Sequence, residues 1–121
     1  MSDIKRLHMN NCYSEATIYK GVVFLAGQVP RQTSGEQQGD IITQAQEVFA
    51  QIDSLLAEAG SDKHRILSSQ IFLADMADYE GFNQAWREWV SLQNSPPRVT
   101  VQARLANPAW KLEMVITAAA Y

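Results

Sequence analysis

One long amphipathic pattern constrains the fold of this chain more than any other feature of its sequence. Between Asp40 and Gly60, apolar residues recur at steps of three and four over about five helical turns. Asp40 stands where an aspartate can cap the first turn, and Gly60 stands where a left-handed C-cap is favoured. The pattern therefore predicts one amphipathic helix. Its apolar face comprises Ile41, Ala45, Val48, Phe49, Ile52, Leu55, Leu56 and Ala59.

Three short runs before this helix predict β-strands. They cover residues 4–9, 15–19 and 22–26, and Gly21 between the last two permits a tight hairpin turn. Residues 22–26 are apolar at every position, which predicts a central strand covered on both faces. Residues 31–39 are rich in Gln, Gly, Ser and Thr and predict an exposed loop, a candidate lid or edge of a site.

The chain after the long helix predicts another strand, a second helix and two final strands. Residues 65–73 alternate as a strand does, and Asp78 can cap a helix. The final strands are predicted over residues 98–105 and 110–116. The order β-β-β-α-β-α-β-β predicts an α+β fold, a single domain over residues 1–121 with a mixed sheet and two helices on one face. The second helix has an apolar face typical of core packing, formed by Tyr79, Phe82, Trp86, Trp89 and Val90.

The sheet face away from the helices is predicted to be covered by other copies of the chain. Alternation leaves side chains there that are too weakly polar for open water, and self-association is the simplest way to cover them. A charged fraction of only 19% agrees with this expectation. The side chains assigned to this face are Thr100, Gln102, Val115, Thr117 and Ala119.

Two charged residues on the final strands suggest a site for a small acid. Arg98 follows two prolines, and the sequence allows two interpretations of its role. It forms either a surface ion pair of small energetic value or a clamp whose forked donors bind both oxygens of a carboxylate. Glu113 stands among apolar residues, so it lies either on an exposed edge or in a buried place where it can carry a proton. The two strands are expected to be neighbours.

Other candidate residues have weaker signals. Tyr13 can contact a ligand or anchor a turn, and Asn83 can contact a ligand or face solvent on its helix. Cys12 has no adjacent base or cationic cluster, which favours an inert thiol. His8 and His64 stand far apart without the spacing of metal ligands, so no metal site is predicted.

The charge and composition of the chain narrow its partners and its location. The formal net charge is −3 and no basic run occurs, which argues against nucleic acid because phosphate binding needs clustered Lys and Arg. A single cysteine fits a reducing compartment. The N-terminus lacks the apolar segment of a signal peptide, and no apolar run approaches the ~20 residues that cross a bilayer. We therefore expect a cytoplasmic protein with no membrane partner.

Several motifs in the same order resemble one known family. Gly27-Gln28-Val29-Pro30 resembles its Gly-Gln-[Ile/Val]-Pro signature, and Tyr13-Ser14 precedes it at the family's spacing. Residues 71–75, then Pro97-Arg98 and Leu112-Glu113-Met114, continue the match. On these motifs the chain is similar to the Rid family (reactive intermediate deaminase, YjgF), also called endoribonuclease L-PSP. It is most similar to the shorter YoaB-like branch.

The resemblance implies a fold, an assembly and an activity. The fold would be chorismate-mutase-like, and three copies would form a homotrimer with a central barrel and sites in the clefts between subunits. The activity would be hydrolysis of enamines and imines such as 2-aminoacrylate to 2-oxo acids and ammonia, with no metal or organic cofactor. A non-catalytic binder of small carboxylates, or a regulatory protein, is the alternative. A ribonuclease or translation inhibitor agrees less well with the acidic charge.

The resemblance also implies roles for individual residues. Arg98 would bind the substrate carboxylate, and Glu113 would activate water and transfer protons. Tyr13 and Asn83 would line the cleft, and the backbone at Gly27 would border it.

Three positions depart from the family pattern. Thr100 replaces the usual cysteine and is assigned here to substrate binding, Ala26 replaces a common serine, and Cys12 replaces a proline. The first two change polar contacts in the cleft.

Overall fold

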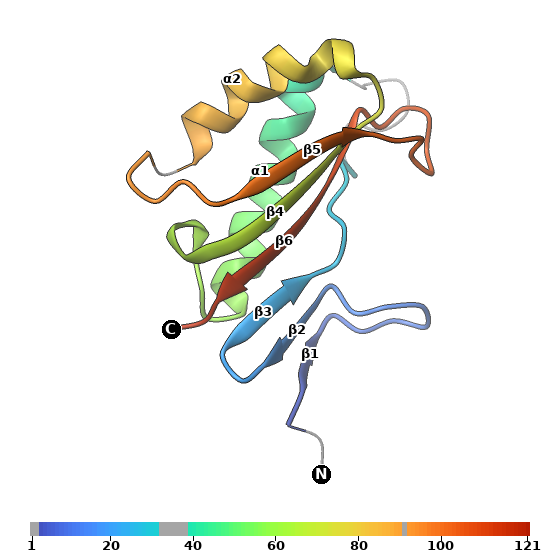
Figure 1. Ribbon diagram of the computed structural model, residues 1–121. Coiled ribbons are helices and arrows are strands. Elements are labelled where there is room, and N and C mark those ends of the chain that lie inside the picture. Colours follow the sequence, from blue (N-terminus) through green and yellow to red (C-terminus); the bar gives the residue numbers. More distant parts are fainter. Residues whose placement is uncertain (1–2, 32–38, 91) are drawn as a thin grey trace.

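The computed structural model describes residues 3–31, 39–90 and 92–121, and its elements follow the predicted order (Figure 1). Most of the loop predicted over residues 31–39 lies outside the described residues. No helix in the described part of the chain is long and apolar enough to cross a membrane. The helices and strands are β1 (Lys5–Leu7), β2 (Ala16–Tyr19), β3 (Val22–Leu25), α1 (Ile41–Glu58), β4 (Ile66–Leu73), α2 (Tyr79–Trp89), β5 (Arg98–Gln102) and β6 (Leu112–Ala119).

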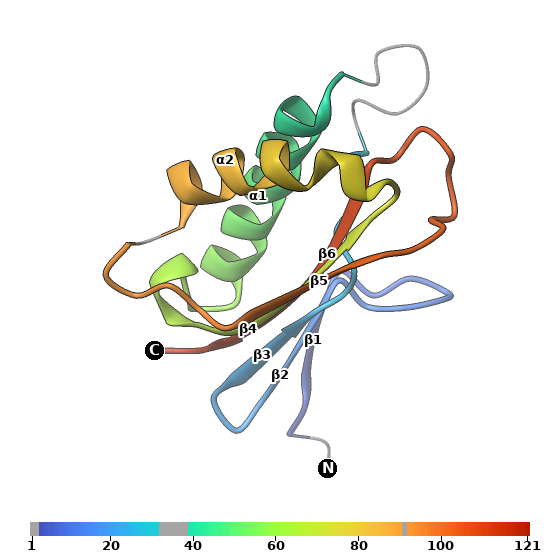
Figure 2. The ribbon, with the colours of Figure 1, turned by 45° about the horizontal axis from the view of Figure 1, so that its top comes forward.

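The strands form one six-stranded sheet in the order β1-β2-β3-β6-β4-β5. Only β4 and β5 pair in parallel, and every other pair is antiparallel, so the predicted mixed sheet is confirmed. Both helices pack on one face of this sheet (Figure 2). In β6 alternate side chains are fully buried beneath the helices, which is the pattern of a strand with one covered face.

The helix α1 forms as the sequence predicts. The Asp40 carboxylate accepts a hydrogen bond from the Thr43 backbone N–H at 2.8 Å, and this bond lowers the pKa of Asp40. Gly60, just after the helix, has a φ of 78° and so adopts the left-handed conformation that glycine favours.

The helix α2 packs by the predicted aromatic face, except for Tyr79, which is 38% exposed. Phe82 is fully buried, and the Phe49 and Trp89 rings stack with centroids 4.4 Å apart. The predicted cap is wrong in one detail, because the Asp78 side chain makes no capping hydrogen bond. A short 3₁₀ turn precedes α2 instead, and Asp75 caps that turn by accepting from the Ala77 N–H at 2.9 Å.

The structure corrects three predictions about the strands. Phe24 of β3 is 47% exposed, so this strand is covered on one face only. The strand β5 ends at Gln102 rather than Leu105. Thr100 and Gln102 lie on the helix side rather than the far side, because they pair in register with Ile71 and Leu73, which are both buried in the core.

Two valines of β5 occupy the uncovered face in place of those polar residues. Val99 is 51% exposed and Val101 is 41% exposed. Val115, Thr117 and Ala119 of β6 are half-buried on the same face, as predicted. The uncovered face is therefore more apolar than the sequence pattern suggested.

Candidate active site

Arg98 lies at the start of the edge strand β5 and points toward α2. Its Nη2 donates a hydrogen bond to the Asn83 side-chain oxygen. Its guanidinium carbon lies 5.2 to 5.8 Å from the ring centroids of Tyr79, Phe82 and Trp86, a distance at which a cation is attracted to an aromatic face. The structure thus brings together two of the predicted site residues, Arg98 and Asn83.

No carboxylate within residues 3–31, 39–90 and 92–121 forms an ion pair with Arg98. The surface ion pair that one reading of the sequence predicted is therefore not found in that part of the chain. Because Asn83 occupies one donor, the other N–H groups of the guanidinium fork keep their capacity for an anion.

Two buried hydroxyls lie on the same sheet face as Arg98. Ser69 pairs with Arg98 in the parallel register of β4 and β5, and Thr100 follows Arg98 by two residues. In the described structure neither the Ser69 Oγ nor the Thr100 Oγ1 has a hydrogen-bond partner. A buried hydroxyl without a partner is costly, and a ligand or water reaching this place would meet two free hydroxyls.

Glu113 lies on the opposite, uncovered face of β6, where its carboxylate crosses the backbone of Gly27. A methyl group added at Gly27 would overlap the Glu113 Oε2 atom and would stand 3.0 Å from its Cδ atom. Glu113 is half-buried, and it pairs in register with Phe72 of β4. A larger residue at position 27 would therefore displace the carboxylate from the position it has in the structure.

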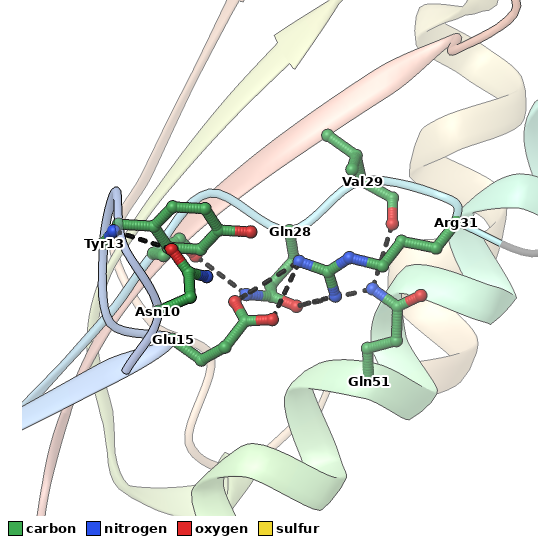
Figure 3. A network of polar contacts seen from close by, with 8 residues as sticks. Asn10, Tyr13, Glu15, Gln28, Val29, Arg31 and Gln51 are labelled. Carbon is green, nitrogen blue, oxygen red and sulfur yellow. Dashed lines mark hydrogen bonds and ion pairs between the residues drawn. The ribbon is translucent and has the colours of Figure 1, made fainter. Parts of the chain in front are cut away.

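Tyr13 is held by the tight loop that leads into β2. The Asn10 side-chain oxygen accepts hydrogen bonds from the backbone N–H groups of Cys12, at 2.7 Å, and Tyr13, at 3.0 Å. The Tyr13 ring is 49% exposed and points toward Gln28 in Figure 3. Tyr13 therefore belongs to the side of the molecule where β3 ends, near Gly27.

A polar network next to Gly27 was not predicted from the sequence. Gln28 is completely buried, and its amide contacts Glu15, Arg31 and Gln51 (Figure 3). Arg31 also forms an ion pair with Glu15 at 3.0 Å. These residues border a pocket of about 360 Å³ between the end of β3 and α1. A glutamine inside an apolar run was the one signal of this network in the sequence.

The predicted site residues form two separate groups within one chain. The strand β4 lies between β5 and β6, so the expected neighbouring of the two strands is wrong. Arg98 lies in the register row of the buried Ile116, and Glu113 alternates with the buried Met114, so the two side chains face opposite sides of the sheet. One chain does not bring Arg98 and Glu113 together.

One further cavity and the potential metal-binding side chains of the described part of the chain add nothing to these two groups. A cavity of about 720 Å³ lies under the loop between β5 and β6, and none of the six predicted site residues lines it. Among the described residues, no group of three or more His, Cys, Asp or Glu side chains could hold a metal ion.

The fold defines a class of small α+β proteins, and comparison with known proteins identifies the family. The model of the family described as Endoribonuclease L-PSP matches residues 3–120. A RutC family protein of Haemophilus ducreyi is 48% identical over 116 residues, which cover 96% of each chain. The RutC family protein YoaB of Escherichia coli is 38% identical over 116 residues, which cover 96% of this chain and 97% of that protein.

A solved structure agrees with the sequence relatives. The crystal structure of a YjgF family member from Neisseria meningitidis superimposes with a TM-score of 0.91 at 43% identity, covering 98% of this chain and 96% of that one. The chain therefore belongs to the endoribonuclease L-PSP family, the Rid/YjgF/RutC family that its motifs resemble.

Proposed function

We propose that the protein hydrolyses reactive enamines and imines of the 2-aminoacrylate and 2-iminopropanoate kind to 2-oxo acids and ammonia. The observation that carries this proposal is the state of Arg98. Its guanidinium is oriented by Asn83 and three aromatic rings, while no carboxylate of the described chain pairs with it. Such a group suits the carboxylate of a small acid, and a charge-assisted hydrogen bond contributes about 1.5–3 kcal/mol.

The reaction needs a clamp, a water and a proton carrier. Arg98 holds the carboxylate, and Thr100 offers its unpartnered hydroxyl on the same face. Glu113 accepts a proton from water as the oxygen attacks the imine carbon. That proton then passes to nitrogen, which gives a carbinolamine. The hydroxyl proton of the carbinolamine transfers to nitrogen as the C–N bond breaks and the C=O bond forms, and a 2-oxo acid and ammonia leave. An enamine first takes a proton at its terminal carbon and becomes the imine. Holding the imine beside an aligned water supplies much of the rate gain.

The proposal includes a homotrimer with a central barrel, because one chain carries only half of each site. The uncovered sheet face exposes Phe24, Val99 and Val101, and self-association would cover these apolar side chains. In such an assembly Arg98 of one subunit meets Glu113 of its neighbour. Tyr13 and Gly27 then border the cleft together with Glu113.

The test generates 2-aminoacrylate in situ with a dehydratase and follows its loss. We expect acceleration by the wild-type protein and little by Arg98→Ala or Arg98→Lys, because a lysine cannot form the bidentate contact. Arg104→Ala is the matched control, since this arginine is exposed in the loop after β5. Both Arg98 variants should keep the mass of the wild-type assembly. Absence of any acceleration by the wild-type protein would reject the proposed activity.

A non-catalytic binder of small carboxylates is the second candidate function. The separation of Arg98 from Glu113 within one chain favours it, because the clamp is complete without the carboxylate. Binding of pyruvate or 2-oxobutanoate without turnover of the imine would support this alternative. A ribonuclease, which the family description names, agrees less well with the net charge of −3.

A further inference from the structure

The buried amide of Gln28 joins three parts of the molecule that lie far apart in the sequence. Its Nε2 donates to the Ala26 carbonyl at 3.0 Å and to Glu15 at 3.4 Å. Its Oε1 accepts from Arg31 at 3.3 Å and from Gln51 at 3.4 Å. The side chain thus ties the end of β3 to the segment before β2 and to α1 (Figure 3).

The backbone around Gln28 is fixed from the opposite side as well. The Gln28 N–H donates to the Met114 carbonyl at 2.8 Å, and the Met114 N–H donates back at 3.0 Å. Gln51 also donates to the Val29 carbonyl at 3.0 Å. The segment from Ala26 to Val29 is therefore held both by side chains and by the strand that carries Glu113.

The consequence falls on Gly27, which lies between two fixed residues and directly against the Glu113 carboxylate. Because a Cβ atom at position 27 would overlap Oε2, the Gly27 backbone limits where the end of this flexible side chain can lie. A misplacement of about 1 Å at a reacting group can cost on the order of 10²-fold in rate.

We propose that Gln28 is a positioning residue, which fixes the Gly27 backbone and thereby the Glu113 carboxylate, and that the Glu15–Arg31 ion pair supports it. The expected effect on rate rests on the proposed function. The expected effect on the Gly27 backbone can be measured without any turnover. Removing the amide takes one hydrogen-bond partner from each of Glu15, Arg31 and Gln51, while Arg98 keeps all of its contacts.

The test compares Gln28→Leu with Gln44→Leu by NMR and by kinetics. Gln44 is also completely buried, but its amide bonds to Ala109 and Lys111 rather than to the segment beside Gly27. In Gln28→Leu we expect a shifted Gly27 amide signal and faster hydrogen exchange at the Met114 amide. We expect kcat to fall by about 10- to 100-fold with KM within about twofold, since substrate binding depends on Arg98.

The outcomes separate this inference from the proposed activity. Unchanged Gly27 and Met114 signals in Gln28→Leu would overturn it, and so would equal changes in Gln44→Leu, which indicate general destabilisation. A wild-type protein without turnover rejects the activity, while the NMR comparison still decides the positioning role.

A second pair of variants serves if Gln28→Leu does not fold. Arg31→Met removes the ion pair with Glu15 and should change the same signals to a smaller extent, whereas Arg31→Lys keeps the charge and should restore them in part. No change in Arg31→Met would contradict the supporting role of the ion pair.

Discussion

Arg98 and Glu113 are held in place by different means. Arg98 lies against side chains of α2, where Asn83 and three aromatic rings orient the guanidinium. Glu113 lies against backbone, where Gly27 leaves just enough space for the carboxylate. The first arrangement depends on helix packing, and the second depends on a segment fixed by buried hydrogen bonds. The surroundings of Arg98 and of Glu113 can therefore be disturbed separately.

The largest expected effect comes from mixing two inactive variants. Arg98→Ala and Glu113→Gln should each lose about 10²-fold or more of the imine hydrolysis, since each removes one half of the site. If the halves come from different subunits, co-refolding equal amounts restores about a quarter of wild-type activity, because random assembly joins an intact Arg98 to an intact Glu113 in that share of clefts. Activity is measured with imine generated in situ.

The control for this mixture uses the double variant Arg98→Ala/Glu113→Gln. Co-refolded with wild-type protein, it should give no more activity than statistical dilution allows. Failure of the two single variants to complement each other would show that Arg98 and Glu113 do not form a shared site between subunits.

The local elements of this fold could be predicted from the sequence, and the pairing of its strands could not. The helix α1 was predictable because its period, its Asp40 cap and Gly60 all act within neighbouring turns. The position of β4 between β5 and β6 depends on pairings between distant segments, which alternation within one strand does not encode.

The same limit explains what was missed at the candidate site. The sequence indicated Arg98 and Glu113 as candidate site residues. It did not show that their side chains lie on opposite faces of the sheet, because that depends on the order in which the strands pair. Gln28 finds its partners at Glu15 and Gln51, 13 and 23 positions away, so the glutamine within an apolar run was visible in the sequence but its partners were not. Thr100 was predicted on the sheet face away from the helices, because polar side chains were expected there. The prediction was wrong, since an edge strand beneath a helix can bury polar side chains and expose valines.

Gly27→Ala is expected to affect the Glu113 half alone. The added methyl group overlaps the carboxylate, so kcat should fall by about 10- to 100-fold while binding through Arg98 is retained. Gly81→Ala is the contrasting variant. A Cβ atom there meets the Ile41 side chain at 2.6 Å and disturbs α2, the helix that orients Arg98, so its effect should fall on KM. The measurement is kcat and KM for both variants. A rise in KM with unchanged kcat in Gly27→Ala would mean that Glu113 serves binding rather than chemistry.

The smallest expected effect concerns the C-terminal end of β6, the strand that carries Glu113. The Tyr121 hydroxyl donates to the Asp62 carboxylate, and Arg65 donates to the carbonyls of Ala119 and Ala120 at 2.9 Å each. The hydrogen bond from Tyr121 lowers the pKa of Asp62 below its usual 3.8, and it raises the pKa of Tyr121 above its usual 10.0. These contacts stabilise the end of β6 while Asp62 is ionised and Tyr121 is protonated.

The two pKa shifts act at opposite ends of the pH scale. Because the pKa of Asp62 is lower in the folded protein, its contribution to stability is complete above 3.8 and is lost as the pH falls through the folded-state value. Because the pKa of Tyr121 is higher in the folded protein, its contribution is complete below 10.0 and is lost as the pH rises through the folded-state value. Both groups are exposed, so each contribution is small.

Thermal unfolding across the acid range tests the Asp62 contribution. In Asp62→Asn the melting temperature should depend less steeply on pH below 3.8 than in the wild-type protein. Asp78→Asn is the control, since its side chain makes no capping hydrogen bond. Equal slopes for Asp62→Asn and the wild-type protein would mean that the Tyr121 contact does not hold in solution. The end of β6 would then depend on Ser61, Arg65 and the backbone hydrogen bonds of the sheet.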